Sequence, residues 1–368
     1  MSGAGILTAL ADKLRSLKSA GSPGTALIGF DGYVDRVVRL KKNQMEPPDL
    51  FEYIGDFARH IQEQPGSSQD IAIKRISEKI GGNGPLMAES LAAKNIAVSC
   101  IGAFGYPEIN SAFDKLAKKA ALFPVEQNAF TLALEFNDAK IMLAETEALD
   151  RIDWKRLVSV LGEEKLFALI HEADIVGITN WSGLSRSNDI LEGMLGILSG
   201  PLKDRKRLCF FDLADPSGKS EEQFRDLFRL MERLSPWFDI ILGLNRKETV
   251  FVYNHFFKLR EKAFDETMAV KLAEAMALEE VVIHGAGLAA AADKKTCRTV
   301  RGITVQPPVI LTGAGDNFNA GYCLGKLCGL DSTSCLYLAD ISASLYVKQG
   351  FSADIDAIIA YIEHFLLT

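Results

Sequence analysis

The feature that most limits what this chain can fold into is an alternation of short β-rich runs with amphipathic helical segments. Apolar runs at 174–178, 207–212, 239–242 and 281–284 are separated by stretches with helical periodicity. In the stretch Glu222–Leu234 one helical face collects Phe224, Leu227, Phe228, Met231 and Leu234. Strand–helix–strand units of this kind place successive strands parallel in one sheet, with helices over its faces. The sequence therefore predicts an α/β fold with a mostly parallel central sheet flanked by helices.

The N-terminal part begins in the same style and then changes character. Apolar residues at helical spacing over 6–17 predict a leading helix, and Thr25–Phe30 predicts the first strand. Two strand-like segments, 130–136 and 140–144, flank Asn137-Asp138, which favours a hairpin. Because hairpin strands are antiparallel, we expect them to form a smaller antiparallel sheet, together with residues 34–40. The alternative is that they are edge strands of the main sheet.

A further helix is predicted over Asp49–Gln62, where apolar residues gather on one side. Proline and glycine bound this segment, with Pro47-Pro48 before it and Pro65-Gly66 after it. It could shape the mouth of a binding site or an oligomer contact, but the pattern favours surface decoration.

Composition excludes several classes of protein. The 368 residues are 48% hydrophobic and carry a formal net charge of −7, which argues against a nucleic acid or an anionic membrane as main partner. The six cysteines show no C-x-x-C pair, and no secretory signal or long apolar span is visible, so we expect a cytoplasmic protein with reduced thiols. Neither a G-x-x-x-x-G-K-[ST] phosphate loop nor a dinucleotide fingerprint occurs.

A glycine-rich turn near the C-terminus, Thr312-Gly313-Ala314-Gly315-Asp316, precedes an apolar helical segment. Glycines let backbone N–H groups approach an anion, and a helix N-terminus adds partial positive charge. Asp316 could take a proton from an attacking hydroxyl. This pattern favours phosphoryl transfer, although a bare G-x-G triplet is more often only a tight turn before a helix.

The run T-G-A-G-D followed by N-F-N-A-G resembles the C-terminal signature of the ribokinase-like (PfkB) carbohydrate kinases. The resemblance implies that Asp316 is the catalytic base and that the backbone of Gly313, Ala314 and Gly315 forms an anion hole. It also implies that Thr312 and Asn319 lie beside the nucleotide. One departure is Ile310, where the family usually has an acidic residue, so a cation site relying on that carboxylate is not expected.

An N-terminal run, Gly81-Gly82-Asn83, precedes a helical segment and resembles the family's other signature. The resemblance implies that these three residues bind substrate, with Asn83 taking over a hydroxyl contact that the family usually makes from the position of Leu86. The family also places a substrate-binding Asp shortly after the first strand. We expect Asp35, rather than Asp31, to fill that role, although capping of a turn is an alternative for either.

The run Asn245-Arg246-Lys247-Glu248 matches the family's N-x-x-E motif, which organises Mg²⁺ near the phosphates. Taken alone, the same pair could be a helix cap. Gly285 and Gly287 resemble the family's nucleotide-flanking turn, with an ordinary hairpin turn as the alternative. Asp212 ends a strand where the family often has polar residues on the phosphate side, but the residues that follow it, 213–215, depart from the family pattern.

These resemblances run in the family's order over residues 25–350. They imply a single ribokinase-like domain over 1–368, a lid near 33–40 and 130–145, and a helical insertion at 47–66. The implied activity is ATP- and Mg²⁺-dependent phosphorylation of a hydroxymethyl group on a sugar or sugar derivative. A nucleoside kinase of the same fold and a catalytically silent ligand-binding protein are the alternatives. Lids of this family sometimes mediate dimerisation, which makes a homodimer a candidate here.

Overall fold

The computed structural model describes residues 3–43, 45, 47–66, 68–198, 206–285 and 287–367. Within these residues, nine strands form the main sheet, in the order β13-β12-β11-β10-β9-β8-β1-β4-β5. The strands from β5 to β11 are parallel, whereas β12 and β13 are antiparallel additions at one edge. Their bounds are β1 Thr25–Phe30, β4 Ala97–Gly102, β5 Ala121–Pro124, β8 Ile175–Ile178, β9 Arg207–Asp212, β10 Phe238–Asn245, β11 Glu280–His284, β12 Ala289–Ala292 and β13 Cys297–Val300.

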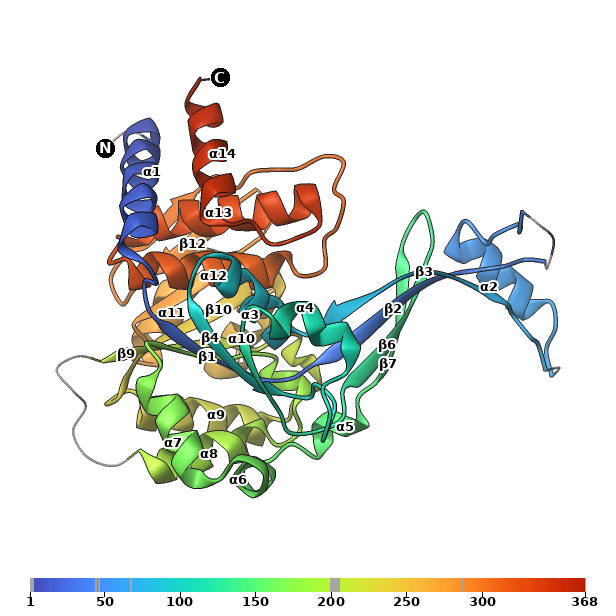
Figure 1. The fold of residues 1–368 in the computed structure, drawn as a ribbon, viewed down its shortest axis with the longest axis horizontal. Helices are drawn as coiled ribbons and strands as arrows, with labels where there is room; N and C mark the ends of the chain where they lie inside the picture. Colours follow the sequence, from blue (N-terminus) through green and yellow to red (C-terminus); the bar gives the residue numbers. More distant parts are fainter. Residues whose placement is uncertain are drawn as a thin grey trace.

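Helices cover both faces of this sheet (Figure 1). One face is covered by α1 Gly3–Ala20, α3 Asn83–Ala93, α4 Asp114–Ala117, α12 Ala314–Leu327, α13 Ser332–Gln349 and α14 Ile355–Leu367. The other is covered by α5 Glu147–Asp150, α6 Trp154–Leu161, α7 Glu163–Glu172, α8 Ser187–Ile197, α9 Glu221–Leu234, α10 Arg246–Phe257 and α11 Thr267–Ala275. Strand β1 shows why two cores result: Leu27 packs into one core, and its neighbour Ile28 into the other. The predicted α/β fold with a mostly parallel sheet is confirmed.

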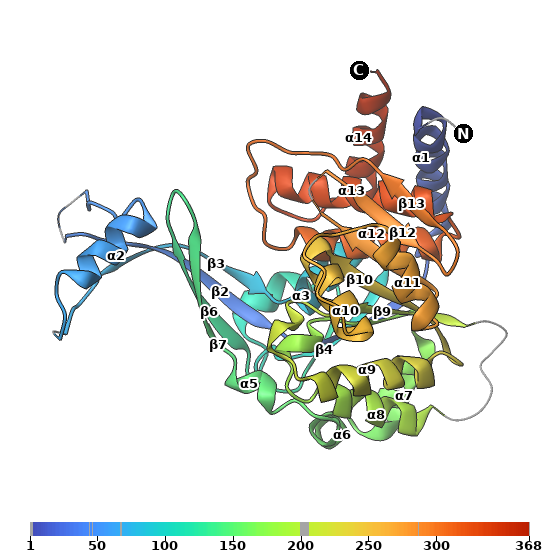
Figure 2. The same cartoon turned by 180° about the vertical axis from the view of Figure 1, so that it is seen from behind.

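A second sheet of four strands projects from the body (Figures 1 and 2). Its order is β3-β2-β6-β7, with β2 Tyr33–Leu40, β3 Ile73–Gly81, β6 Ala129–Glu135 and β7 Lys140–Glu145. The pairs β2/β3 and β6/β7 are antiparallel, and β2 lies parallel to β6 between them. The expectation of a separate smaller sheet is confirmed, and the alternative of edge strands on the main sheet is wrong. We call this sheet the lid.

The helix predicted over Asp49–Gln62 begins five residues later than expected, since α2 spans Ile54–Gln62. The first residues of the segment continue the strand pairing instead. Leu50 forms a bridge with Lys41, and the amide of Phe51 donates to the carbonyl of Leu40. Helix α2 lies at the far end of the lid in both views (Figures 1 and 2). There a small core forms from Val38, Leu40, Phe51, Leu134 and Phe136, with Phe57 of α2 packed against it.

The two ends of the chain lie side by side, because α1 packs along α14 (Figure 1). Among the helices of the described residues, none is both long and apolar enough to cross a membrane.

Candidate active site

The carboxyl ends of several parallel strands meet the first turns of α3, α10 and α12 at one edge of the main sheet. Asp212 ends β9, Asn245 ends β10 and His284 ends β11. Open α/β sheets bind their ligands at this edge. A cavity of about 240 Å³ lies there, lined by Gly82, Asn83, Leu86, Asp212, Ala214, Asn245, Glu248, His284, Thr312, Gly313, Gly315 and Asp316. The structure therefore brings the N-terminal and C-terminal signatures to one cavity.

The glycine turn places a left-handed glycine directly before a helix N-terminus. Gly313 has φ +98° and directly precedes α12, whose first residues are Ala314 and Gly315. A Cβ on Gly313 would lie 2.6 Å from the hydroxyl oxygen of Tyr346, so both the backbone conformation and the space require glycine. The first amides of a helix have no partner within it. Here the amide of Ala314 donates to the carbonyl of Leu311 at 3.2 Å, whereas the amides of Gly313 and Gly315 have no backbone partner among the described residues.

Asp316 is buried in the first turn of α12, with 5% of its surface exposed. Its Oδ1 accepts a hydrogen bond of 2.9 Å from Nδ2 of Asn83, across 233 positions of sequence. Burial, followed by the negative charge of Asp212, raises the pKa of Asp316 well above its ordinary value, and the Asn83 bond opposes that shift. Asn83 thus contacts the predicted base itself, which sequence reasoning did not anticipate.

Asp212 belongs to the same cluster of carboxylates. Its Oδ2 accepts from Nδ2 of Asn319 at 2.7 Å, and its Oδ1 accepts from the amide of Ala214 at 2.8 Å. Burial raises the pKa of Asp212 to about 6. Asn319 therefore connects Asp212 to the helix that carries Asp316. The signal for Asp212 was its place at the end of a buried parallel strand, even though the residues after it depart from the family pattern.

Asn245 and Glu248 form a reciprocal cap at the start of α10. The amide of Asn245 donates to Oε2 of Glu248 at 2.8 Å, and the amide of Glu248 donates to Oδ1 of Asn245 at 2.9 Å. The capping alternative is therefore present in the structure, alongside the cavity position of both residues. Burial raises the pKa of Glu248 to about 8, with Asp212 adding to the shift.

These oxygen-bearing side chains fit a hard divalent cation by their chemistry. Among the described residues, no group of three or more His, Cys, Asp or Glu side chains is arranged to hold a metal by itself. This combination suits Mg²⁺, which keeps waters and binds through one or two protein groups together with substrate phosphates. Binding a cation would also offset the burial of Asp212 and Glu248 in their charged forms.

A second cavity, of about 310 Å³, adjoins the first and shares His284 and Gly315 with it. Its other lining residues are Gly285, Ile303, Thr304, Val305, Leu311, Ala314, Phe318, Asp340, Ala343, Ser344 and Val347. Gly285 was predicted to lie near the nucleotide and does line this cavity. Gly287 does not line it and lies beyond, in the turn to β12, with φ +81°.

His284 was missed as a site residue, although it ends β11 directly before Gly285, which drew attention to the turn. A Cβ on Gly315 would lie 3.0 Å from Cε1 of the His284 ring, so the ring lies directly against the first turn of α12. Burial lowers the pKa of His284 to about 4, which keeps the ring neutral at pH 7. Its position between the two cavities is the property that sequence alone did not reveal.

The two aspartates near the first strand have different environments. Asp31 is fully buried and accepts hydrogen bonds from the amides of Asn83 and Gly84 and from Nδ2 of Asn180, at 2.8–2.9 Å. It therefore holds the start of α3. Asp35 lies on β2 of the lid, paired across the strands with Lys79 and Thr131.

Asp35 does not line either cavity, but it lies against one of the predicted substrate-binding glycines. A Cβ on Gly81 would come within 2.4 Å of Oδ2 of Asp35. Burial raises the pKa of Asp35, and a hydrogen bond with Thr131 opposes the shift. Gly82 and Asn83 do line the first cavity, so Gly81 connects that cavity to Asp35 on the lid.

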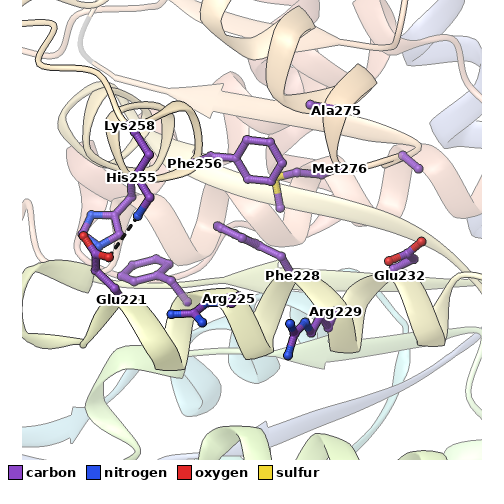
Figure 3. Close-up of a pocket in the computed structure, with 12 residues that line it drawn as sticks. Glu221, Arg225, Phe228, Arg229, Glu232, His255, Phe256, Lys258, Ala275 and Met276 are labelled. Carbon is purple, nitrogen blue, oxygen red and sulfur yellow. Dashed lines mark ion pairs between the residues drawn. The ribbon is translucent and has the colours of Figure 1, made fainter.

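The largest of the cavities described, about 410 Å³, lies elsewhere (Figure 3). It opens between α9, α10 and α11, where Phe228 and Phe256 face Met276 and the ion pair of Glu221 with Lys258 spans 3.1 Å. None of the site residues predicted from the sequence line it. Because it has neither a glycine turn nor a buried carboxylate, we do not place the reaction there.

Comparison with known proteins gives a consistent result. A sequence model of the family described as prokaryotic ketohexokinase matches residues 6–365. A ketohexokinase from Haloferax volcanii is 25% identical over 369 residues, covering 97% of this chain and 96% of that protein.

Solved structures show the same fold at lower identity. A ribokinase from Arabidopsis thaliana complexed with ribose and ATP has a TM-score of 0.66 at 15% identity, covering 93% of this chain and 99% of that one. A nucleoside kinase from Methanocaldococcus jannaschii, described as an archaeal member of the ribokinase family, has a TM-score of 0.64 at 15% identity, with 94% and 99% coverage. The fold is therefore ribokinase-like, and the likeness to both kinds of kinase does not choose between their substrates.

Proposed function

The chain belongs to the prokaryotic ketohexokinase family and is a carbohydrate kinase, and from this premise we propose that it transfers the γ-phosphoryl group of ATP to a hydroxymethyl group of a ketohexose. The observation that carries the proposal is the position of Asp316. It lies directly after the Gly313–Gly315 turn and is bonded to Asn83 in a cavity that both signatures line.

In the proposed mechanism Asp316 takes the proton of the attacking hydroxyl. The amides of Gly313 and Gly315 would stabilise the negative charge that develops on the transferring group, whereas the amide of Ala314, predicted to join them, already donates to the carbonyl of Leu311. The Asn83 bond fixes the orientation of the Asp316 carboxylate and favours its charged form, which a base requires.

Asn245 and Glu248 would hold Mg²⁺ through water, with Asp212 close by, and this cation would neutralise phosphate charge and favour in-line geometry. Thr312 lines the first cavity and would meet the phosphate end of the nucleotide, and Gly285 lines the second. Asn319 is buried against Asp212 and would act by positioning it, and Gly287 lies outside both cavities. The second cavity, joined to the first through His284 and Gly315, would take the rest of the nucleotide.

The acceptor is proposed to bind between the first cavity and the lid. Gly81, Gly82 and Asn83 run from the cavity to Asp35, so acceptor hydroxyls placed along them would reach polar groups at both ends. The lid would exclude water that otherwise competes for the phosphoryl group.

The test is ADP release with Mg-ATP against ketohexoses, aldohexoses, pentoses and nucleosides. We expect ketohexoses to give the highest kcat/KM. Turnover on nucleosides alone would instead support the nucleoside kinase alternative, and silence across the whole panel would support a ligand-binding protein without catalysis.

A homodimer through the lid stays a prediction. Exposed apolar side chains on its edge strands, Ile73 and Ile76 of β3 with Met142 and Leu143 of β7, are consistent with it. Light scattering during size-exclusion chromatography measures the mass directly, and a monomer at micromolar concentration would contradict this prediction.

A further inference from the structure

The second cavity contains one buried carboxylate that the mechanism above does not use. Asp340, on α13, is 8% exposed and lines this cavity. Its Oδ2 accepts a hydrogen bond of 2.8 Å from the amide of Ile303. Within the described part of the chain the carboxylate accepts no other hydrogen bond, so its Oδ1 has unused acceptor capacity.

The free oxygen of Asp340 lies in surroundings that disfavour a negative charge. The same cavity is lined by the apolar side chains of Val305, Leu311, Ala343 and Val347, together with the polar Thr304 and Ser344. Burial raises the pKa of Asp340 to about 6, so the carboxyl is mainly charged at neutral pH in a place that disfavours charge. A buried acceptor in such a wall is stabilised when a ligand supplies an N–H donor.

The location determines which part of a ligand meets this oxygen. The anion hole and Asp316 define where the γ-phosphate would lie, and the Asp340 cavity is reached from there past His284 and Gly315. A largely apolar cavity with a few polar groups, next to a phosphate site, suits the base of a nucleotide. The donors that a base presents at its edge are then the groups that Asp340 would meet.

We propose that Asp340 selects the nucleotide base, with its free carboxylate oxygen accepting a hydrogen bond from the exocyclic amino group of adenine. This inference rests on the proposed use of a nucleoside triphosphate but not on the identity of the acceptor sugar. Hypoxanthine has the same ring system with a carbonyl in place of that amino group. Its oxygen would face a carboxylate oxygen, and the two acceptors would repel each other.

The experiment measures binding of ADP and IDP to the whole protein by titration calorimetry, without acceptor and therefore without turnover. Wild type should bind ADP at least about tenfold more tightly than IDP, the usual effect of a hydrogen bond to a charged group. Asp340→Asn keeps an oxygen for the amide of Ile303 and adds an N–H₂ donor, so the preference should fall or invert in favour of IDP.

Ser344→Ala supplies the matched control. Ser344 lines the same cavity and ties the same loop to α13, since its hydroxyl donates to the carbonyl of Ile303 at 3.4 Å. Loosening the loop in this way should change the binding of both nucleotides alike and leave the ADP-to-IDP ratio as in wild type. Thermal unfolding of both variants checks that they are folded.

Equal binding of ADP and IDP by wild type, or a ratio that Asp340→Asn leaves unchanged, would overturn the proposal and leave Asp340 as an anchor for the loop. GDP bound as tightly as ADP would also overturn it, because guanine lacks the amino group at that position. If no nucleotide binds at millimolar concentration, the proposed kinase activity fails as well, so the two failures are distinguishable.

Discussion

Single residues at this site serve a structural and a chemical role at once, and experiments must separate the two. Glu248 closes a helix cap with Asn245 while its carboxylate lines the cavity. Asp31 is the nearest carboxylate with which to compare Asp35, but it accepts three hydrogen bonds, two of them from amides at the start of α3. Its removal would disturb the fold, so it is not a matched control.

Glu248→Gln should raise the Mg²⁺ concentration needed for half-maximal rate, because it removes a negative charge near the proposed cation. Glutamine can close the same capping box, so the helix start should remain intact. A magnesium titration of the rate, compared with thermal unfolding of the same variant, separates the two roles. An unchanged titration would limit Glu248 to capping.

Asp35→Ala should lower kcat/KM for the acceptor at least about tenfold and leave ATP affinity unaltered, because its carboxylate is proposed to bind acceptor hydroxyls. Initial rates at varied acceptor and a separate ATP-binding measurement check both parts. The matched control is Glu145→Ala, which changes an exposed carboxylate on β7 of the lid. Glu145 pairs with Phe130, whereas Asp35 pairs with the next residue, Thr131. Because side chains alternate along a strand, Glu145 lies on the opposite face of the lid from Asp35. Equal effects of the two changes would remove Asp35 from the acceptor site.

At the residue scale, the sequence predicted correctly those residues whose type is required by their immediate neighbours along the chain. The φ of +98° at Gly313 and the cap by Asn245 follow from neighbouring residues. The contact of Asn83 with Asp316 and the position of His284 between two cavities depend on which elements meet in space. No local pattern encodes those meetings, so they needed the structure.

At the scale of elements, strands with a clear apolar run were predicted closely, and strands without one were not. Strands β1 and β9 have the bounds that their apolar runs indicate. Strand β3 was missed because most of its residues are exposed. A strand that buries neither face needs no alternation of apolar and polar residues, so its sequence carries no strand pattern. Helix α2 begins late because Leu50 and Phe51 pair with the end of β2 instead.

The packing of α2 on the lid predicts a local effect. Phe57→Ala should loosen the far end of the lid, because Phe57 packs between Phe51 and Phe136 at ring-centroid distances of 5.4 and 5.9 Å. Hydrogen exchange should quicken in the distal halves of β2 and β6 and stay unchanged in β9 and β10. Ile61→Ala, on the exposed side of the same helix, is the control. Exchange unaffected at the lid tip would show that α2 does not stabilise it.

Helix α3, which positions Asn83, is held at its other end by a fully buried lysine. Lys94 donates to the carbonyl and the hydroxyl of Ser90 and to the carbonyl of Ala353. Burial lowers the pKa of Lys94 to about 7, from an ordinary value of 10.5. Between these two pH values the unfolded chain binds a proton that the folded chain has released.

The free energy of unfolding should therefore rise with pH across that window by at most about 1.4 kcal/mol per pH unit from this group. Lys94→Met removes the contribution, so wild type should gain stability relative to the variant as pH increases from 7 to 10. Urea unfolding of both proteins at several pH values measures the difference. If the unfolding free energies of the two proteins changed with pH in parallel, Lys94 would not lose its proton in the folded state.

At the scale of the whole molecule, the active site is an assembly of distant parts. Two signatures separated by more than 200 residues meet at one edge of the sheet, since Asn83 bonds Asp316 with a sequence separation of 233. The lid would add Asp35 from a sheet outside the main body. The order of the signatures was enough to predict the fold, whereas the identity of the sugar depends on the space between lid and cavity, which side chains from several elements shape together.

The central claim is that this assembly performs phosphoryl transfer with Asp316 as the base. Its most direct test is the kcat of Asp316→Asn with Mg-ATP and a ketohexose, with ATP affinity measured separately. The account predicts a kcat lower by about 10²–10⁴ and an ATP affinity little changed, because asparagine keeps the shape of the side chain but cannot take the proton. A variant that retains more than about a tenth of wild-type kcat would contradict the assignment of Asp316 as the base.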